Sequence, residues 1–159
     1  MPADPITGQK PFPATSVLAV AIIIADFIIR YLKDLNVPPP LALLFYPAIG
    51  FVAEIVFHVA PLALLLLVST PLVPQLGKER VVWIAILLVA ATEPTYHVLF
   101  DEKSCTAAAA YTGIHVFVIA SLQLYVFRRC DFVSMLFFRL FYYAYWHILW
   151  GVVRLEVLF

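Results

Sequence analysis

The chain has 159 residues and no formal net charge, and 64% of its residues are hydrophobic while only 13% are charged. Ordinary soluble domains are about 45–50% apolar and about 25% charged, and so short a chain keeps much of its surface accessible when folded. The composition therefore excludes a water-soluble fold and predicts a protein that is embedded in lipid. Nucleic acid is excluded as a partner, because there is no basic run with interleaved polar residues.

The apolar segments predict an all-α fold, a polytopic bundle of transmembrane helices. Residues 1–15 form a polar N-terminal tail in this prediction, and residues 16–159 form a single transmembrane domain. The first predicted span is Ser16–Leu32. The second segment, Leu41–Val73, would extend about 50 Å as a helix, against a hydrocarbon core of about 30 Å. Its internal prolines either kink one long tilted helix, or the chain turns near His58–Pro61 and returns as a hairpin.

Three more segments bring the total to about five spans, or six if the second segment is a hairpin: Val81–Phe100, Thr106–Phe127 and Phe132–Phe159. Loops rich in Lys and Arg stay in the cytoplasm. Both alternatives place the Lys78–Arg80 and Arg128–Arg129 loops on the cytoplasmic side. We therefore predict a multi-pass integral membrane protein in which these two loops share one side of the bilayer.

Ionisable residues inside the spans are costly to bury, so they mark either a function or a structural pair. They are Asp26, Arg30, Glu54, His58, Glu93, His97, His115, Arg139, His147 and Arg154. Glu54 and His58 are four residues apart, as are Glu93 and His97, so each pair would share a helix face. Asp26 and Arg30 have the same spacing and are predicted to form an ion pair within one helix.

Three of these residues fall at similar predicted depths on three different segments. At about 1.5 Å per residue, Glu93 lies about 10 Å, His115 about 14 Å and His147 about 8 Å below the non-cytoplasmic surface. Carboxylate and imidazole suit a divalent metal, so Glu93, His97, His115 and His147 are candidate ligands, with Glu93 as a candidate catalytic base. His115 or His147 alone could instead bind a tetrapyrrole cofactor.

The alternative without a metal is that Glu93 and the histidines form hydrogen bonds with one another, or with backbone carbonyls freed by Pro94, and hold helices together. The last segment carries a related pattern, because Arg139, Tyr143, His147 and Arg154 recur at offsets of four, four and seven residues. This spacing predicts one polar stripe on an otherwise aromatic helix. Such a stripe must face protein or a wet cavity.

Thr92-Glu93-Pro94-Thr95-Tyr96-His97 and the stretch from Tyr125 to His147 resemble the CAAX protease and bacteriocin-processing family (CPBP) of intramembrane peptidases. The first motif of that family is two adjacent glutamates followed, after three residues, by arginine. Here Thr92 and His97 take the places of the first glutamate and the arginine, and His115 partly substitutes for a Phe-x-x-x-His motif. The resemblance implies that Glu93, His115 and His147 activate water for peptide cleavage.

Two classes of function follow from these observations. The first is a non-catalytic accessory or scaffold subunit, because so short a chain has little room outside the lipid and would bind other membrane protein subunits. The second is a metal-dependent intramembrane hydrolase that uses Glu93 as general base and His115 and His147 as ligands. A haem- or chlorophyll-binding membrane subunit is a further alternative.

Overall fold

The structure is a computed structural model that describes residues 12–29, 31, 33, 36–100 and 106–159. Every regular element in those ranges is a helix, which confirms the predicted all-α fold. In chain order the elements are α1 Phe12–Ile29, α2 Ala42–Ala53, η2 Glu54–Val59, α3 Ala60–Val68, η3 Thr70–Leu72, α4 Val73–Leu76, α5 Lys78–Ala90, α6 Thr92–Phe100, α7 Thr106–Arg129, α8 Phe132–Tyr143, η4 Ala144–Trp150 and α9 Gly151–Val157. The predicted tail lies mostly outside the described residues, and α1 begins at Phe12 instead of Ser16.

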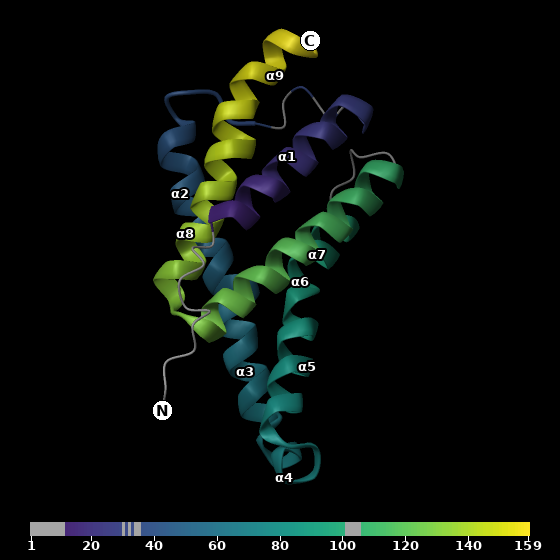
Figure 1. The fold of residues 1–159 in the computed structure, drawn as a ribbon, viewed down its shortest axis with the longest axis vertical. Coiled ribbons are helices and arrows are strands. Elements are labelled where there is room, and N and C mark those ends of the chain that lie inside the picture. The colour runs from purple at the N-terminus through teal and green to yellow at the C-terminus, as the bar shows by residue number, and fades with distance from the viewer. Residues whose placement is uncertain (1–11, 30, 32, 34–35, 101–105) are drawn as a thin grey trace.

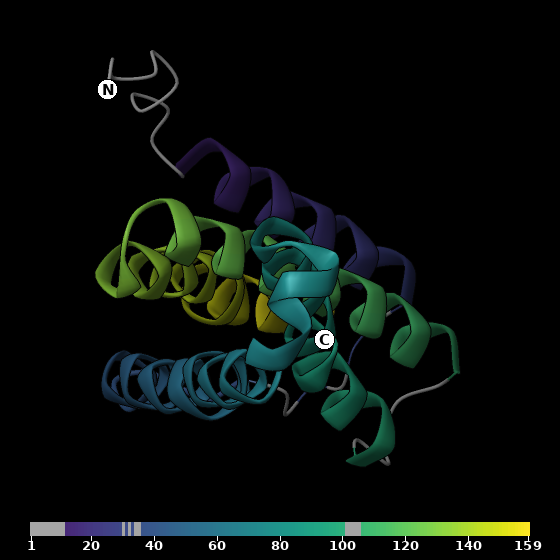
Figure 2. The same ribbon diagram turned by 90° about the horizontal axis from the view of Figure 1, so that it is seen from below.

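The helix formed by α8, η4 and α9 occupies the middle of the bundle. It contacts α1 on one side and α2 on the other, and α7 packs against α1, α5, α6 and α8. Figure 1 shows this helix beside α2, with α1 and α7 crossing obliquely, and α3 beside α5 at the lower end. In Figure 2, seen from below, α1 and the α2–α3 helix lie on opposite sides of α7 and α8. Residues of α2, α6, α7 and α8 can therefore meet in the interior.

The second predicted segment is one long helix, the first of the two alternatives above. α2, η2 and α3 continue without a break from Ala42 to Val68, and η2 is a π-helix in which the Ala60 N–H donates to the Ile55 carbonyl. Pro61 follows at the start of α3 and has no N–H, so the Phe57 carbonyl loses its α-helical donor. The Thr92 hydroxyl lies 3.0 Å from that carbonyl and 2.8 Å from the Val89 carbonyl, and its single hydrogen is shared between these two acceptors. The proline therefore lies within a continuous helix and does not begin a turn.

Among the described residues, four helices are long and apolar enough to cross a membrane: Ala42–Val68, Lys78–Phe100, Ala107–Arg129 and Phe132–Val157. α1 is also apolar, but its 18 residues extend only about 27 Å, just under the usual hydrocarbon thickness. A fifth span in α1 remains a prediction. The predicted Lys78–Arg80 loop is helical, because α5 begins at Lys78. Gly77 separates α4 from α5, and its φ of +81° is a backbone conformation that favours glycine.

The distribution of side chains is the inverse of that in a soluble protein. Large apolar side chains point outward, with Ile28 79% and Leu44 75% exposed, whereas Asp26, Glu54 and Arg154 are fully buried. Water would penalise both features, since exposed apolar area and buried charge each raise the free energy of a soluble fold. Hydrocarbon around the bundle removes the first penalty. The second is removed only if the buried charges are paired.

A two-residue connection joins α7 to α8 at one end of the bundle. Asp131 is the N-cap of α8, and its carboxylate accepts a hydrogen bond of 2.7 Å from the Ser134 backbone N–H. This bond satisfies a donor that the first turn of a helix leaves open, and it holds the pKa of the exposed Asp131 carboxyl below its usual value. The cap makes a tight reversal possible between two long helices.

Candidate functional site

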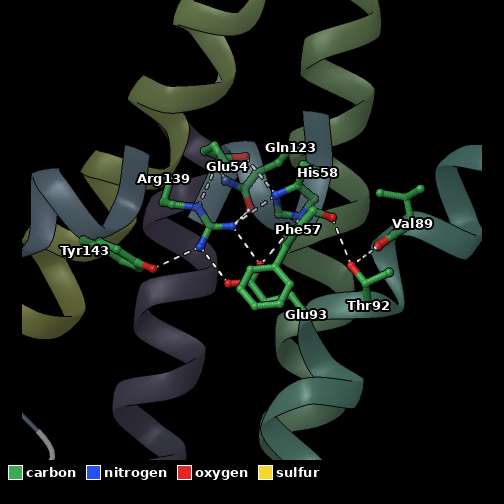
Figure 3. A network of polar contacts seen from close by, with 9 residues as sticks. All are labelled: Glu54, Phe57, His58, Val89, Thr92, Glu93, Gln123, Arg139 and Tyr143. Carbon is green, nitrogen blue, oxygen red and sulfur yellow. Dashed lines mark hydrogen bonds and ion pairs between the residues drawn. The ribbon is translucent and has the colours of Figure 1, made fainter. Parts of the chain in front are cut away.

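Four helical elements meet at a set of buried polar side chains that we call the ionic cluster: Glu54 and His58 from η2, Glu93 from α6, Gln123 from α7 and Arg139 from α8 (Figure 3). The widened turn of the π-helix presents Glu54 and His58 together on the inner side of the long second helix. Short π-helical turns within α-helices are frequently found at functional sites. Glu93 enters in the first turn of α6, next to Thr92, whose hydroxyl ties α6 to η2.

Arg139 is the centre of the ionic cluster. Its Nε donates to Glu54 Oε1 at 2.7 Å, and its two terminal nitrogens donate to the two carboxylate oxygens of Glu93, both at 2.8 Å. The second hydrogen of Nη1 is directed to the Tyr143 hydroxyl at 3.0 Å, and Nη2 has Gln123 Oε1 at 3.3 Å. A guanidinium has five N–H donors. Each of them therefore has an acceptor, and the pairing with Glu93 is bidentate, the strongest geometry for this type of contact.

A glycine on α2 brings α8 close enough for these contacts. A Cβ atom at Gly50 would lie 3.3 Å from Tyr143 Cε2 and 3.5 Å from Arg139 Cδ. Small residues at such a crossing let two membrane helices approach closely. The stem of Arg139 therefore lies against the backbone of α2, and its guanidinium reaches η2 and α6.

The remaining contacts join the acidic residues to the other helices. The Gln123 amide donates to Glu54 Oε1, the same oxygen that accepts from Arg139 Nε. The imidazole of His58 lies between the carboxylates, with Nδ1 2.9 Å from Glu54 Oε2 and Nε2 3.6 Å from Glu93 Oε2. Nδ1 is also 3.4 Å from Arg139 Nη2. The contact between His58 Nδ1 and Glu54 Oε2 is close but lacks hydrogen-bond geometry, so Glu54 Oε2 and His58 Nε2 are buried without a hydrogen-bond partner among the described residues.

The ionic cluster holds opposite charges in a nearly water-free interior. The side chains of Glu54 and His58 are 0% exposed, that of Arg139 3% and that of Glu93 7%. Two ionised carboxylates and one guanidinium leave a formal charge of −1. Arg139 keeps its proton at all ordinary pH values. It contacts Glu54, His58 and Glu93. The arrangement therefore supplies a fixed cation to both acids.

The residues predicted as a metal or cofactor site have different surroundings. Glu93 is in the ionic cluster, whereas His115 Nε2 is 3.1 Å from the Tyr142 hydroxyl and its ring stacks on Tyr111. In the part of the chain that the structure describes, no group of three or more His, Cys, Asp or Glu side chains is placed to hold a metal ion. The predicted ligand set Glu93, His97, His115 and His147 is therefore not assembled there.

His147 belongs to a separate contact between α2, η4 and the segment before α2. Its Nδ1 is 2.8 Å from Asn36 Oδ1, and its ring stacks on Tyr46 with the centroids 4.4 Å apart. The Tyr46 hydroxyl in turn accepts a hydrogen bond from the Val37 backbone N–H at 2.9 Å. Since an amide oxygen can only accept, His147 Nδ1 is a donor, and the residue holds the entry to α2 against η4. His97 is partly buried on α6 and lies in a ring contact with Tyr96.

A second group of buried charges joins α1 to α9. Asp26 accepts hydrogen bonds from Arg154 Nε at 2.7 Å, from Arg154 Nη2 at 3.0 Å and from the Trp150 indole at 2.7 Å. The predicted partner of Asp26, Arg30, lies outside the described residues. The ion pair of Asp26 that the structure describes is thus between distant parts of the chain and not within one helix.

The polar stripe predicted for the last segment divides into two rows. Arg139, Tyr143 and His147 face α2 and η2, but Arg154 continues the row that includes Trp150 and faces α1. The reason is the π-helix η4, Ala144–Trp150, which contains His147 and ends before Arg154. Its i→i+5 bonding takes more residues per turn, so a step of seven no longer returns to the same side. The prediction that these residues face protein is confirmed, while the single stripe is wrong.

The sequence reasoning missed the central role of Arg139 and the participation of Gln123. It placed Arg139 in the stripe and paired Glu54 with His58, but it assigned none of them to a site with Glu93. The only available signal for Gln123 was a primary amide within an apolar span, and that signal does not indicate which residue the amide contacts. No family model, curated protein or solved structure matches the chain.

Proposed function

We propose that this protein is a non-catalytic accessory or scaffold subunit of a larger membrane complex, and that the ionic cluster is a structural device. The observation that carries this proposal is the state of Arg139, whose five donors are all directed to partners within the bundle. A catalytic carboxylate must be able to reach a substrate or an activated water. Here both carboxylates are engaged by a cation that cannot give up its proton.

The resemblance to the CPBP intramembrane peptidases fits a relative that has lost activity. In that family's first motif a second glutamate is followed four residues later by arginine, and both Glu54–His58 and Glu93–His97 keep this spacing with histidine in the last place. Each pair also lacks the preceding glutamate, because Ala53 precedes Glu54 and Thr92 precedes Glu93. Peptide hydrolysis would need a free carboxylate to activate water, and the bidentate bond from Arg139 removes Glu93 from that role.

The outer surface supports a role in binding membrane proteins. Large apolar side chains cover the outside of the described helices, and the described connections between them are short, as at Gly77 and at Cys130–Asp131. The chain therefore offers partners its helix faces, since a membrane helix associates through packing with neighbouring helices. In this proposal lipid covers the faces that no subunit occupies.

The test uses a cluster-neutral variant, Glu54→Gln with Glu93→Gln and Arg139→Met. Replacing a whole buried ion network by neutral groups of similar volume is often tolerated by a fold, whereas removing one partner is not. We expect the affinity-tagged cluster-neutral protein to be helical, to restore the phenotype of a deletion strain, and to co-purify with the same membrane subunits as the wild type in mild detergent. Lys33→Gln, a change at an exposed lysine outside the ionic cluster, is the control for tagging and expression.

Two results would overturn the proposal. One is a folded cluster-neutral protein that binds its partners but fails to restore the phenotype, because the charges would then be needed for chemistry. The other is a wild-type protein that purifies as a lone monodisperse monomer. Elemental analysis of the same preparation separates the alternatives, since stoichiometric zinc, iron or cobalt would favour the hydrolase, and a visible absorption band would favour a tetrapyrrole.

A further inference from the structure

The two basic segments predicted to share one side of the bilayer meet at one end of the bundle. Glu79, in the first turn of α5, forms an ion pair with Arg128, in the last turn of α7. The pairing requires the start of the Lys78–Phe100 helix and the end of the Ala107–Arg129 helix to lie at the same level. Lys78, Arg80 and Arg129 are exposed around this contact.

Aromatic rings hold the two arginines of α7 in place. The Arg128 guanidinium lies 4.7 Å from the centre of the Trp83 ring, and the Arg129 guanidinium lies 5.7 Å from the centre of the Tyr125 ring. The Trp83 and Tyr125 rings are themselves stacked, with centroids 6.2 Å apart and an interplanar angle of 17°. Cation–π contacts of this kind orient a guanidinium and reduce the freedom it loses on binding an anion.

The charges at this end are unbalanced. Lys78, Arg80, Arg128 and Arg129 contribute four positive charges, and Glu79 and Asp131 contribute two negative ones, which leaves an excess of two. Trp and Tyr side chains at the ends of membrane helices occupy the headgroup level of the bilayer. The positive excess therefore lies at the level of the lipid phosphates.

An apolar surface continues from the aromatic pair toward the middle of α5. Trp83 and Tyr125 are each 38% exposed, and Ile84, Leu87 and Leu88 of α5 are about half exposed on the same side of the helix. A ligand that follows this surface has an anionic group at one end and hydrocarbon at the other. Free phosphate would use only the first part of it.

We propose that Lys78, Arg80 and Arg129, with the Trp83–Tyr125 pair, form a binding site for the phosphate headgroup of an anionic membrane phospholipid. Arg128 is already paired with Glu79 and holds α5 and α7 together beneath the headgroup. The acyl chains of the lipid lie along Ile84, Leu87 and Leu88. This inference depends on the membrane placement of α5 and α7 and is independent of whether the protein is catalytic.

The first experiment counts lipids bound to the purified full-length protein by native mass spectrometry from mild detergent. The probes are phosphatidylglycerol and phosphatidylcholine with identical acyl chains, and glycerol phosphate is the soluble competitor. We expect the wild type to prefer phosphatidylglycerol, and Lys78→Gln with Arg80→Gln and Arg129→Gln to lose that preference by about fivefold for each neutralised cation. The control is Lys33→Gln with Lys103→Gln, and it should keep the preference. Lys33 precedes the Ala42–Val68 helix and Lys103 follows the Lys78–Phe100 helix in the sequence, so one long helix separates each lysine from the basic end.

A second measurement locates the lipid without changing a charge. Of the three tryptophans, Trp146 and Trp150 are buried and Trp83 is exposed. Phosphatidylglycerol brominated close to the headgroup should quench the fluorescence of the wild type more than brominated phosphatidylcholine does, and Trp83→Phe should abolish the difference. Equal binding or quenching by the two lipids would overturn the proposal, as would a triple variant that keeps its preference or a control that loses it. Displacement by glycerol phosphate would also overturn it, because the site would then recognise a soluble phosphate.

Discussion

Removing the charge of Arg139 alone should destabilise the fold severely. Arg139→Met would leave Glu54 and Glu93 buried without the guanidinium that forms ion pairs with both carboxylates. Their side chains are only 0% and 7% exposed. Breaking a buried ion pair by removing one partner costs about 3–5 kcal/mol. The folding equilibrium should therefore fall by roughly two to four orders of magnitude. Arg139→Lys should lie between the wild type and Arg139→Met, because an ammonium keeps the charge but not the bidentate fork.

Unfolding in mixed micelles, with increasing sodium dodecyl sulfate and with helicity followed by circular dichroism, measures this free energy. The cluster-neutral variant Glu54→Gln, Glu93→Gln, Arg139→Met should recover most of the loss, since it leaves no unpaired charge. Lys33→Met, at an exposed position, should stay within about 0.5 kcal/mol of the wild type. A change smaller than about 1 kcal/mol for Arg139→Met would refute the reasoning, because it would mean that the two carboxylates tolerate burial without their cation.

Three further changes test local parts of the structure by the same assay. Gly151→Ala should destabilise the fold by about 1–3 kcal/mol, because the new Cβ atom would lie 2.9 Å from Asn36 Nδ2. A loss below about 1 kcal/mol would show that the segment before α2 can move away from the new Cβ atom. Thr92→Val should cost about 1 kcal/mol through the loss of the hydroxyl donor that the Phe57 and Val89 carbonyls share; an unchanged midpoint would mean that neither carbonyl needs this donor. Because the pKa of Asp131 is lowered in the fold, its ionised form stabilises the protein above the unfolded pKa of about 3.9, and this contribution is lost as the pH falls through the lowered value. Between pH 6 and pH 3 the wild type should thus lose stability relative to Asp131→Asn, and parallel curves for the two proteins would contradict the cap.

Composition and hydropathy were sufficient to predict the helical class and most helix positions. The last four apolar segments correspond to the four helices in the described part of the chain that are long and apolar enough to cross a membrane, with ends that differ by a few residues. This is expected, because lipid demands that every backbone polar group be bonded within the segment, and a helix is the local solution. The same reasoning could not choose between a kink and a hairpin at Pro61. The tertiary structure made that choice, because the helix continues through Pro61 and the freed Phe57 carbonyl lies within reach of the Thr92 hydroxyl, which is distant in sequence.

The membership of the ionic cluster was decided by tertiary structure alone. The sequence alone showed that charges such as Glu54, Glu93 and Arg139 lie in apolar segments and that each needs a partner. It could not name the partners, because the distance along the chain between Glu54 and Arg139 contains no information about how the helices cross. Two π-helical turns and the close approach at Gly50 set those crossings. The residue types and the surrounding lipid thus determine that each buried charge needs a partner. The rotation and packing of whole helices determine which residue that partner is.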